Sequence, residues 1–338
     1  MSDGRIKVLY IAGLGRSGST LLGNVLGQVD GFASIGEIRL IWEYGLILNK
    51  VCGCGALFGE CEMWQPVLSE AFGGTSQVDP RRMIYLRESW ARTKHIPLML
   101  EPPGRRLVKR RLEEYLDSLE KLYRAVQTTT GSRVIVDTSK FPSYGFVLGM
   151  VPSVDLHVIH LVRDPRAVAY SWLRKKLQPD PETPEYTPQE SPAGTSLRWM
   201  ARNLGTEAFW RRSPRRYLML RYEDFVDEPQ KTIGRVLELV QEGTASLPHV
   251  AEHEVKLGAN HNIWGNPNRF QTGLVRLRPD DEWASRMRSR DKMLVTLLTF
   301  PLLVRYGYPL TAGGRGPASG GDGRRGTGGV SIGRTRAS

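Results

Sequence analysis

The sequence lacks a long uninterrupted hydrophobic run. Its longest late apolar run, Met293 to Val304, contains Pro301 and is shorter than the ~20 residues that a membrane-spanning helix needs. At the N-terminus no apolar segment stands apart from the first predicted strand, and no small-residue cleavage site follows, so we expect no secretory signal. These absences exclude a transmembrane segment from the prediction and favour a cytoplasmic protein.

Cysteine is scarce, and the three cysteines of the chain, Cys52, Cys54 and Cys61, lie within ten residues of each other. In a reducing compartment they are predicted to be thiols. A Cys-x-Cys…Cys cluster can bind zinc, but no fourth ligand is apparent nearby in the sequence. We therefore expect structural thiols or one labile disulfide, and no metal site.

Acidic residues are outnumbered, with 35 Asp and Glu against 47 Lys and Arg, and the net charge of +12 indicates an anionic partner. Residues 311–338 are rich in Gly, Arg and Ser, and we predict that they form a disordered tail. Forty per cent of the residues are hydrophobic, which is enough for a sizeable core. We predict a single domain over residues 1–310.

Apolar runs alternate with helical patterns along the chain, which predicts an α/β fold with three layers (α/β/α) and a central parallel sheet. We predict strands over residues 5–12, 32–35, 133–136, 156–162 and 217–222. Helices are predicted over about 19–28, 63–71, 80–94, 106–127, 165–176, 194–211, from Pro229, and 281–298. Residues 38–130 then form a helical insertion, and the segment 177–192, with five prolines, forms a lid loop.

A glycine-rich stretch follows the first predicted strand, with the sequence Gly13-Leu14-Gly15-Arg16-Ser17-Gly18-Ser19-Thr20. A strand, a glycine-rich turn and a helix in this order point backbone N–H groups at an anion. The spacing from Gly13 to Gly18 fits the phosphate-loop frame G-x-x-x-x-G-K-[ST], but Ser19 stands at the lysine position. The positive charge lies at Arg16 instead, so the loop lacks the lysine that nucleotide hydrolases place on the β- and γ-phosphates.

Polar residues follow several predicted strands, where ligands of parallel sheets bind. They are Arg16, Ser19, Glu37, Asp137, Lys140 and Arg163. Arg163 precedes a helix that starts at Pro165, and Ser171 lies on the same face of that helix as Asp164. An arginine and a serine in these positions can hold a second phosphate. We expect a nucleotide with two separate anionic groups.

Four segments resemble sulfotransferases that use 3′-phosphoadenosine 5′-phosphosulfate (PAPS). The glycine-rich loop is similar to their phosphosulfate loop, and Val162 to Ser171 to their 3′-phosphate motif. Residues 265–270 resemble the late loop that closes over the nucleotide in bacterial members, and residues 221–225 match a common family segment. The resemblance spans about residues 6–308 and implies the sulfotransferase fold, which is like that of P-loop NTPases.

The resemblance also implies roles for individual residues. The residues that hold the 5′-phosphate and the sulfonate are Arg16, Ser17, Gly18, Ser19 and Thr20. Arg163 and Ser171 bind the 3′-phosphate, Asn266 and Arg269 close from the late loop, and Lys140 stabilises the sulfonate in transfer. The general base implied by glycan- and tyrosine-modifying relatives is Glu37. Asp137 is the alternative base. A second interpretation of Glu37 is an acid at a helix N-terminus that the helix dipole stabilises.

Other readings stay open. A small-molecule kinase would use ATP and Mg²⁺, with Asp137 holding the metal, whereas sulfuryl transfer is expected to need no metal. A non-enzymatic nucleotide or nucleic-acid binder would use the basic surface. The acceptor is expected to be a small molecule, glycolipid or sugar with a hydroxyl or amine, and monomer and homodimer remain open. We expect His157 and His160 to be packed. The aromatic residues Trp42, Tyr44, Trp64, Trp172 and Trp199 are expected mainly in the core, and the alternative for Trp42 and Tyr44, which follow Glu37, is a place in the acceptor pocket.

Overall fold

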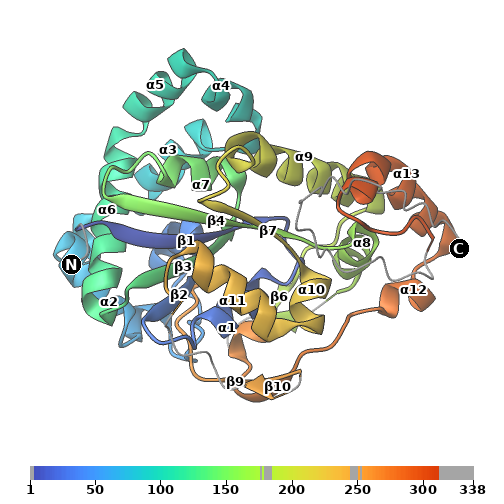
Figure 1. Ribbon diagram of the computed structural model, residues 1–338. Coiled ribbons are helices and arrows are strands. Elements are labelled where there is room, and N and C mark those ends of the chain that lie inside the picture. Colours follow the sequence, from blue (N-terminus) through green and yellow to red (C-terminus); the bar gives the residue numbers. More distant parts are fainter. Residues whose placement is uncertain (1–3, 176, 179–184, 244–249, 252, 312–338) are drawn as a thin grey trace, which may run out of the picture.

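The predicted strands form one five-stranded sheet in the computed structural model, which describes residues 4–175, 177–178, 185–243, 250–251 and 253–311 (Figure 1). The strands, in their order across the sheet, are β2 (Phe32–Gly36), β3 (Val134–Lys140), β1 (Ile6–Gly13), β4 (Val154–Val162) and β7 (Tyr217–Arg221). All neighbouring pairs are parallel. The prediction of an α/β fold with a central parallel sheet is confirmed.

Helices cover both faces of the sheet (Figure 1). Val8 and Tyr10 of β1 face one way and pack with α6 (Glu113–Thr130) and α7 (Pro142–Leu148). Leu9 and Ile11 face the other way and pack with α1 (Ser19–Leu26) and α11 (Pro229–Leu239). All four side chains are fully buried, as expected for a strand between two helical layers. This alternation produces the three layers.

The insertion between β2 and β3 is helical, as expected. Its other elements are η1 (Ile38–Leu40), η2 (Ile41–Ile47), η3 (Phe58–Glu60), α2 (Trp64–Phe72), η4 (Thr75–Gln77), α3 (Pro80–Trp90), η5 (Thr93–His95), α4 (Ile96–Leu100) and α5 (Pro102–Arg111). The prediction of one helix over 106–127 is wrong, because the chain breaks at Leu112 between α5 and α6. Leu112 has ψ 12° and is fully buried, so its packing overrides the helical pattern.

The C-terminal half contains predicted helices and others that the pattern did not predict. Besides α11, its helices are α8 (Pro165–Leu173), α9 (Pro192–Trp210), α10 (Tyr222–Asp227), η6 (Pro267–Phe270), α12 (Glu282–Arg286) and α13 (Ser289–Arg305). The separate helices α7 and α10 were not predicted, and the helix expected over 281–298 is interrupted between α12 and α13. A small antiparallel sheet, also missed, contains β8 (Val250–Ala251), β9 (Glu254–Leu257) and β10 (Gly273–Arg276).

Two expected segments are covered only in part. In the predicted lid over 177–192, β5 (Leu177–Gln178) pairs with β6 (Glu185–Tyr186), and residues 179–184 lie outside the described residues. The predicted tail is also outside them from residue 312 onward. Among the helices that are described, none combines the length and the apolar character needed to cross a membrane.

Candidate active site

The glycine-rich loop links β1 to α1, and its glycines stand where the backbone requires them. Gly13 has φ +144°, and a Cβ atom there would lie 2.4 Å from the backbone oxygen of Leu161. Gly18 has φ +90°, and a Cβ there would lie 2.3 Å from the Tyr222 ring. Within the described part of the chain, no side chain caps the N-terminus of α1 at Gly18. The first N–H groups of this helix are therefore available to an anion.

Replacing Gly13 with Ala is expected to lower the free energy of unfolding by about 3 kcal/mol, because the new methyl group meets a backbone oxygen at a disfavoured φ. Urea denaturation followed by circular dichroism measures this change. Gly234→Ala in α11 is the matched control, since a Cβ there meets no atom of the described residues within 4 Å and alanine favours helix. Equal stability of the two variants would contradict the expectation.

A cavity of about 360 Å³ opens at the carboxyl ends of the strands and is the place where most of the predicted site residues meet. The predicted residues that line it are Arg16, Gly18, Ser19, Thr20, Glu37, Lys140, Arg163, Ser171 and Asn266. They come from five segments that are far apart in the sequence. The cavity therefore lies where ligands of parallel α/β sheets bind.

Glu37 and Lys140 form an ion pair in this cavity. Glu37 directly follows β2 and Lys140 ends β3, and these two strands are neighbours in the sheet. Lys140 has φ +69°, an uncommon conformation for a lysine, and its Nζ also donates a hydrogen bond to the Thr138 oxygen over 3.1 Å. Both side chains are largely buried, so the pair presents one carboxylate and one ammonium group to a bound ligand.

Arg163 directly follows β4, which neighbours β1 on the side away from β3 and β2. Its guanidinium donates a hydrogen bond to the Arg16 oxygen over 2.9 Å and forms an ion pair with Asp280, Nη2 to Oδ2 2.9 Å. The guanidinium carbon also lies 4.5 Å from the centroid of the Tyr222 ring. Asp164 begins α8 as its N-cap, accepting from the Arg166 backbone N–H. Arg163 is thereby held against the loop, and Ser171 lines the same cavity.

Asp137 does not line the cavity. Its carboxylate is fully buried and accepts hydrogen bonds from the Tyr123 hydroxyl (2.6 Å) and from the hydroxyl (2.6 Å) and backbone N–H (2.8 Å) of Ser139. Burial raises the pKa of Asp137 to about 6. The structure therefore contradicts both roles considered for Asp137, as the alternative base and as the metal ligand of a kinase. Its side chain points into the α6 layer.

Two other predicted residues lie behind the cavity lining. Ser17 is 1% exposed and contributes backbone to the loop. Arg269 is 2% exposed, packs against Trp264 and Phe270, and donates a hydrogen bond to the Gly265 oxygen over 3.2 Å. The expectation that its guanidinium reaches the ligand does not agree with this position, because its neighbours bury it beneath the late loop. Asn266 of that loop does reach the cavity and donates its backbone N–H to Thr20 Oγ1 over 3.4 Å.

Several cavity residues were not predicted. They are Arg198, Arg202, Trp172, Trp264 and Asp280. Arg198 and Arg202 are four residues apart in α9, so a basic helix face was a signal that could have identified them. Burial lowers the pKa of Arg202 to about 9. Asp280 lies in an irregular segment, and nothing in the local pattern points to it.

The aromatic and histidine predictions have mixed outcomes. Tyr44 lines the cavity and stacks on Trp264, with ring centroids 3.9 Å apart. Trp42 is fully buried in the insertion core, which confirms the prediction that it is a core residue, and its alternative place in the acceptor pocket is wrong. His160 is packed as predicted, bonded to Tyr217 and Asn203, and burial lowers its pKa to about 4.

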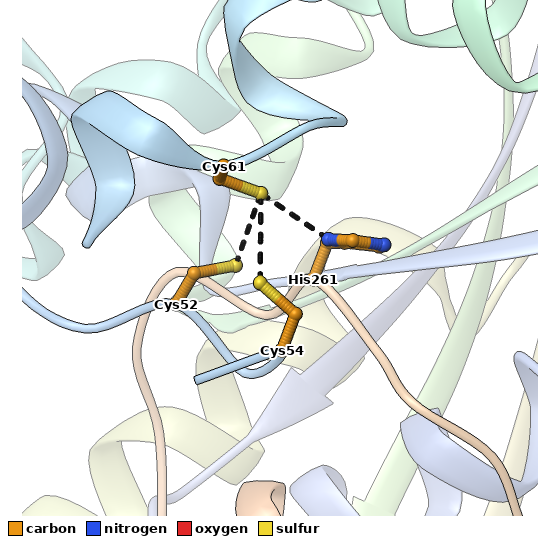
Figure 2. Close-up of side chains that lie close together, drawn as sticks. All are labelled: Cys52, Cys54, Cys61 and His261. Carbon is orange, nitrogen blue, oxygen red and sulfur yellow. Dashed lines mark hydrogen bonds between the residues drawn. The ribbon is translucent and has the colours of Figure 1, made fainter. Parts of the chain in front are cut away.

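The expectation that the cysteines have no fourth ligand nearby is wrong. Figure 2 shows His261 beside Cys52, Cys54 and Cys61, with His261 Nδ1 3.2 Å from Cys61 Sγ. The histidine is 200 residues further along the chain, so only the folded structure brings it to the cysteines.

A model of the sulfotransferase family matches residues 9–243, more than two thirds of the chain, from the glycine-rich loop past the Arg163 motif. The chain belongs to the sulfotransferase family. The fold of this sulfotransferase is also similar to two solved structures. One is the sulfotransferase domain from the olefin synthase of Synechococcus PCC 7002 (19% identity, 90% of this chain and 96% of that chain covered, TM-score 0.53). The other is the sulfotransferase domain from the curacin biosynthetic pathway (19% identity, 90% and 98% covered, TM-score 0.52). No curated protein matches this sulfotransferase significantly in sequence.

Proposed function

We propose that this sulfotransferase moves a sulfuryl group from PAPS to a hydroxyl or amine of a small-molecule, glycolipid or sugar acceptor. The observation that carries the proposal is the shared lining of one cavity by two separate anion-binding sets and a glutamate–lysine pair. The first set is the glycine-rich loop with the uncapped N-terminus of α1, and the second contains Arg163 and Ser171. Two anion-binding sets suit a nucleotide that is phosphorylated at two positions.

In this proposal the nucleotide lies along the cavity between the two sets. The loop N–H groups, with Arg16, Ser19 and Thr20, hold the 5′-phosphate and the sulfonate. Arg163 and Ser171 hold the 3′-phosphate, and Asn266 closes from the late loop. Arg269 is assigned a supporting role in place of the expected contact with the nucleotide, since its guanidinium donates a hydrogen bond to the Gly265 oxygen of that loop. When bound, PAPS supplies the activated sulfuryl group.

The Glu37–Lys140 pair has the chemistry that acceptor activation needs. Glu37 accepts the proton of the acceptor hydroxyl at a carboxylate oxygen, and the ion pair with Lys140 holds this carboxylate in place at the cavity. Once Glu37 is protonated its attraction for Lys140 weakens, and the ammonium group is then available to the sulfonate oxygens. As in phosphoryl transfer, positioning and charge stabilisation are expected to supply most of the rate enhancement.

The acceptor side of the cavity is part aromatic and part basic. Tyr44 and Trp264 form a stacked wall, and Phe141 lies under the guanidinium of Arg202 at 3.4 Å from the ring centroid. Aromatic side chains in a cavity wall suit acceptors with extended apolar surface, among them sugar rings. The wall therefore supports the acceptor classes proposed above.

Two features make the kinase reading the weaker one. Ser19 stands at the lysine position of the phosphate-loop frame. Asp137, the residue expected to hold Mg²⁺, is buried and its oxygens already accept hydrogen bonds from Tyr123 and Ser139. A kinase needs both a phosphate-binding lysine and a metal-holding carboxylate at these places.

Calorimetric titration separates the two functions. The full chain is expected to bind adenosine 3′,5′-bisphosphate with EDTA present, at least about 10-fold more tightly than AMP, because only the bisphosphate engages Arg163. An acceptor screen with PAPS labelled in its sulfate group follows. Absence of bisphosphate binding, or tighter binding of ATP that requires Mg²⁺, would contradict the proposal.

A further inference from the structure

Four side chains that bind metals well lie together at the edge of the helical insertion. Cys52 and Cys54 belong to the turn between η2 and η3, Cys61 follows η3, and His261 belongs to the segment between β9 and η6 (Figure 2). Their sulfur and nitrogen atoms all lie within 4.8 Å of one another. All three cysteines are free thiols, and Cys52 and Cys61 are fully buried.

The separations match a tetrahedron around a small cation. The Cys61 sulfur lies 3.6 Å from the Cys52 sulfur, 3.8 Å from the Cys54 sulfur and 3.2 Å from His261 Nδ1. Tetrahedral zinc, with Zn–S of about 2.3 Å and Zn–N of about 2.0 Å, requires edges of about 3.8 Å between sulfurs and about 3.5 Å between sulfur and nitrogen. These three separations are close to such edges, and the remaining pairs of donor atoms lie within 4.8 Å, so shifts of about 1 Å or less bring all four atoms around one ion.

We propose that Cys52, Cys54, Cys61 and His261 bind one structural Zn²⁺ ion. Three thiolates and one imidazole form the Cys₃His set that zinc prefers over harder cations. Four protein ligands complete a tetrahedron and leave no position for water or substrate, which is the property of a structural site. The site is separate from the sulfuryl-transfer chemistry, since none of its four ligands lines the cavity.

A disulfide explains the cluster less well. It would join two of the sulfurs and would involve neither the third thiol nor His261, although an imidazole nitrogen of His261 points at the buried Cys61 sulfur. One ion uses all four groups at once. The turn that carries Cys52 and Cys54 is closed by the Gly55 backbone N–H, which donates to the Cys52 oxygen over 2.9 Å.

The backbone around the cluster is arranged to hold both segments in register. The Gly53 N–H donates to the Asn262 oxygen over 3.0 Å, and Trp64 Nε1 donates to the His261 oxygen over 2.9 Å. A Cβ at Gly53 would lie 2.1 Å from Asn260 Oδ1, so the two segments touch at a residue with no side chain. Contacts of this kind fix the direction of a metal ligand.

The ion has a consequence for the late loop. His261 precedes Trp264, Gly265 and Asn266 by three to five residues, and these three line the cavity. Zinc bound by His261 would tie the start of this loop to the insertion and so limit how far the loop can open. Its removal is expected to loosen the loop and leave the glycine-rich loop intact.

Metal analysis of the full chain tests the proposal. Purified under reducing conditions and dialysed against zinc-free buffer, it is expected to contain about one Zn²⁺ per chain by plasma mass spectrometry. Cys61→Ser and His261→Ala are expected to retain less than about a tenth of this, whereas His261→Cys, which keeps four ligands, retains it. His95→Ala is the matched control and keeps full metal content, since His95 lies outside the cluster.

Cobalt substitution tests the geometry even if a variant folds poorly. Co²⁺ added to the chelator-treated wild-type chain is expected to give the intense visible bands of tetrahedral cobalt with thiolate ligands, and Cys54→Ser, an exposed position, weakens them. A wild-type chain that takes up no zinc after reconstitution would overturn the proposal, as would full metal retention by Cys61→Ser. Neither measurement involves nucleotide, so a failed metal site leaves the proposed transfer function unaffected.

Discussion

Replacing Glu37 with Gln is expected to lower turnover about 10³-fold while the affinity for adenosine 3′,5′-bisphosphate changes less than about 3-fold. Glutamine keeps the size and one acceptor oxygen of the side chain but cannot take a proton from the acceptor. Glu37 lines the cavity beside Lys140 and is not part of the glycine-rich loop, so the nucleotide contacts persist. The effect therefore falls on turnover and not on donor binding.

Labelled PAPS with an acceptor from the screen measures turnover, and calorimetry measures bisphosphate affinity. Glu70→Gln is the matched control, since Glu70 is exposed on α2 and outside the cavity lining. Its turnover is expected to equal that of the wild type. Wild-type turnover in Glu37→Gln would remove Glu37 from the mechanism. A loss of bisphosphate binding as large as the loss of turnover would instead make it a residue that positions the donor.

The sheet was predictable from sequence because a parallel strand buried on both faces is a nearly continuous apolar run. The run ending at Gly13 is apolar from Val8 onward, the run ending at Val162 is mostly apolar despite His157 and His160, and both are interior strands. Parallel strands place their carboxyl ends at one edge, so the polar residues after each strand could be predicted to meet. This reasoning brought together Arg16, Glu37 and Arg163.

Local pattern could not predict which way a polar side chain at a strand end points. Asp137 and Lys140 end the same strand, but Asp137 faces the α6 layer, where Tyr123 occupies its carboxylate. Lys140 instead has a left-handed φ of +69° and pairs with Glu37 in the cavity. The partners of Cys61 and Arg163, which are His261 and Asp280, lie 100 to 200 residues away and depend on tertiary packing.

A substitution of Arg163 distinguishes the two anion-binding subsites of the proposal. Arg163→Gln is expected to weaken binding of the bisphosphate about 10- to 100-fold, because each charge-assisted hydrogen bond to a phosphate contributes about 1.5–3 kcal/mol. AMP lacks the 3′-phosphate, so its affinity is expected to change less than about 3-fold. Arg163 also donates to the Arg16 oxygen, and AMP binding measures any disturbance of the loop that this loss causes.

Asp280→Asn is the matched variant, and its expected effect on bisphosphate affinity is opposite to that of Arg163→Gln. Asp280 faces the same cavity and pairs with Arg163, so its negative charge opposes an incoming phosphate and competes for the guanidinium. Removal of this charge is expected to tighten bisphosphate binding about 3- to 10-fold and to leave AMP unchanged, with the difference reduced at high salt. If Arg163→Gln weakened AMP and the bisphosphate equally, Arg163 would support the loop and not bind the second phosphate. Opposite effects of the two variants, confined to the bisphosphate, would locate the 3′-phosphate beside Arg163.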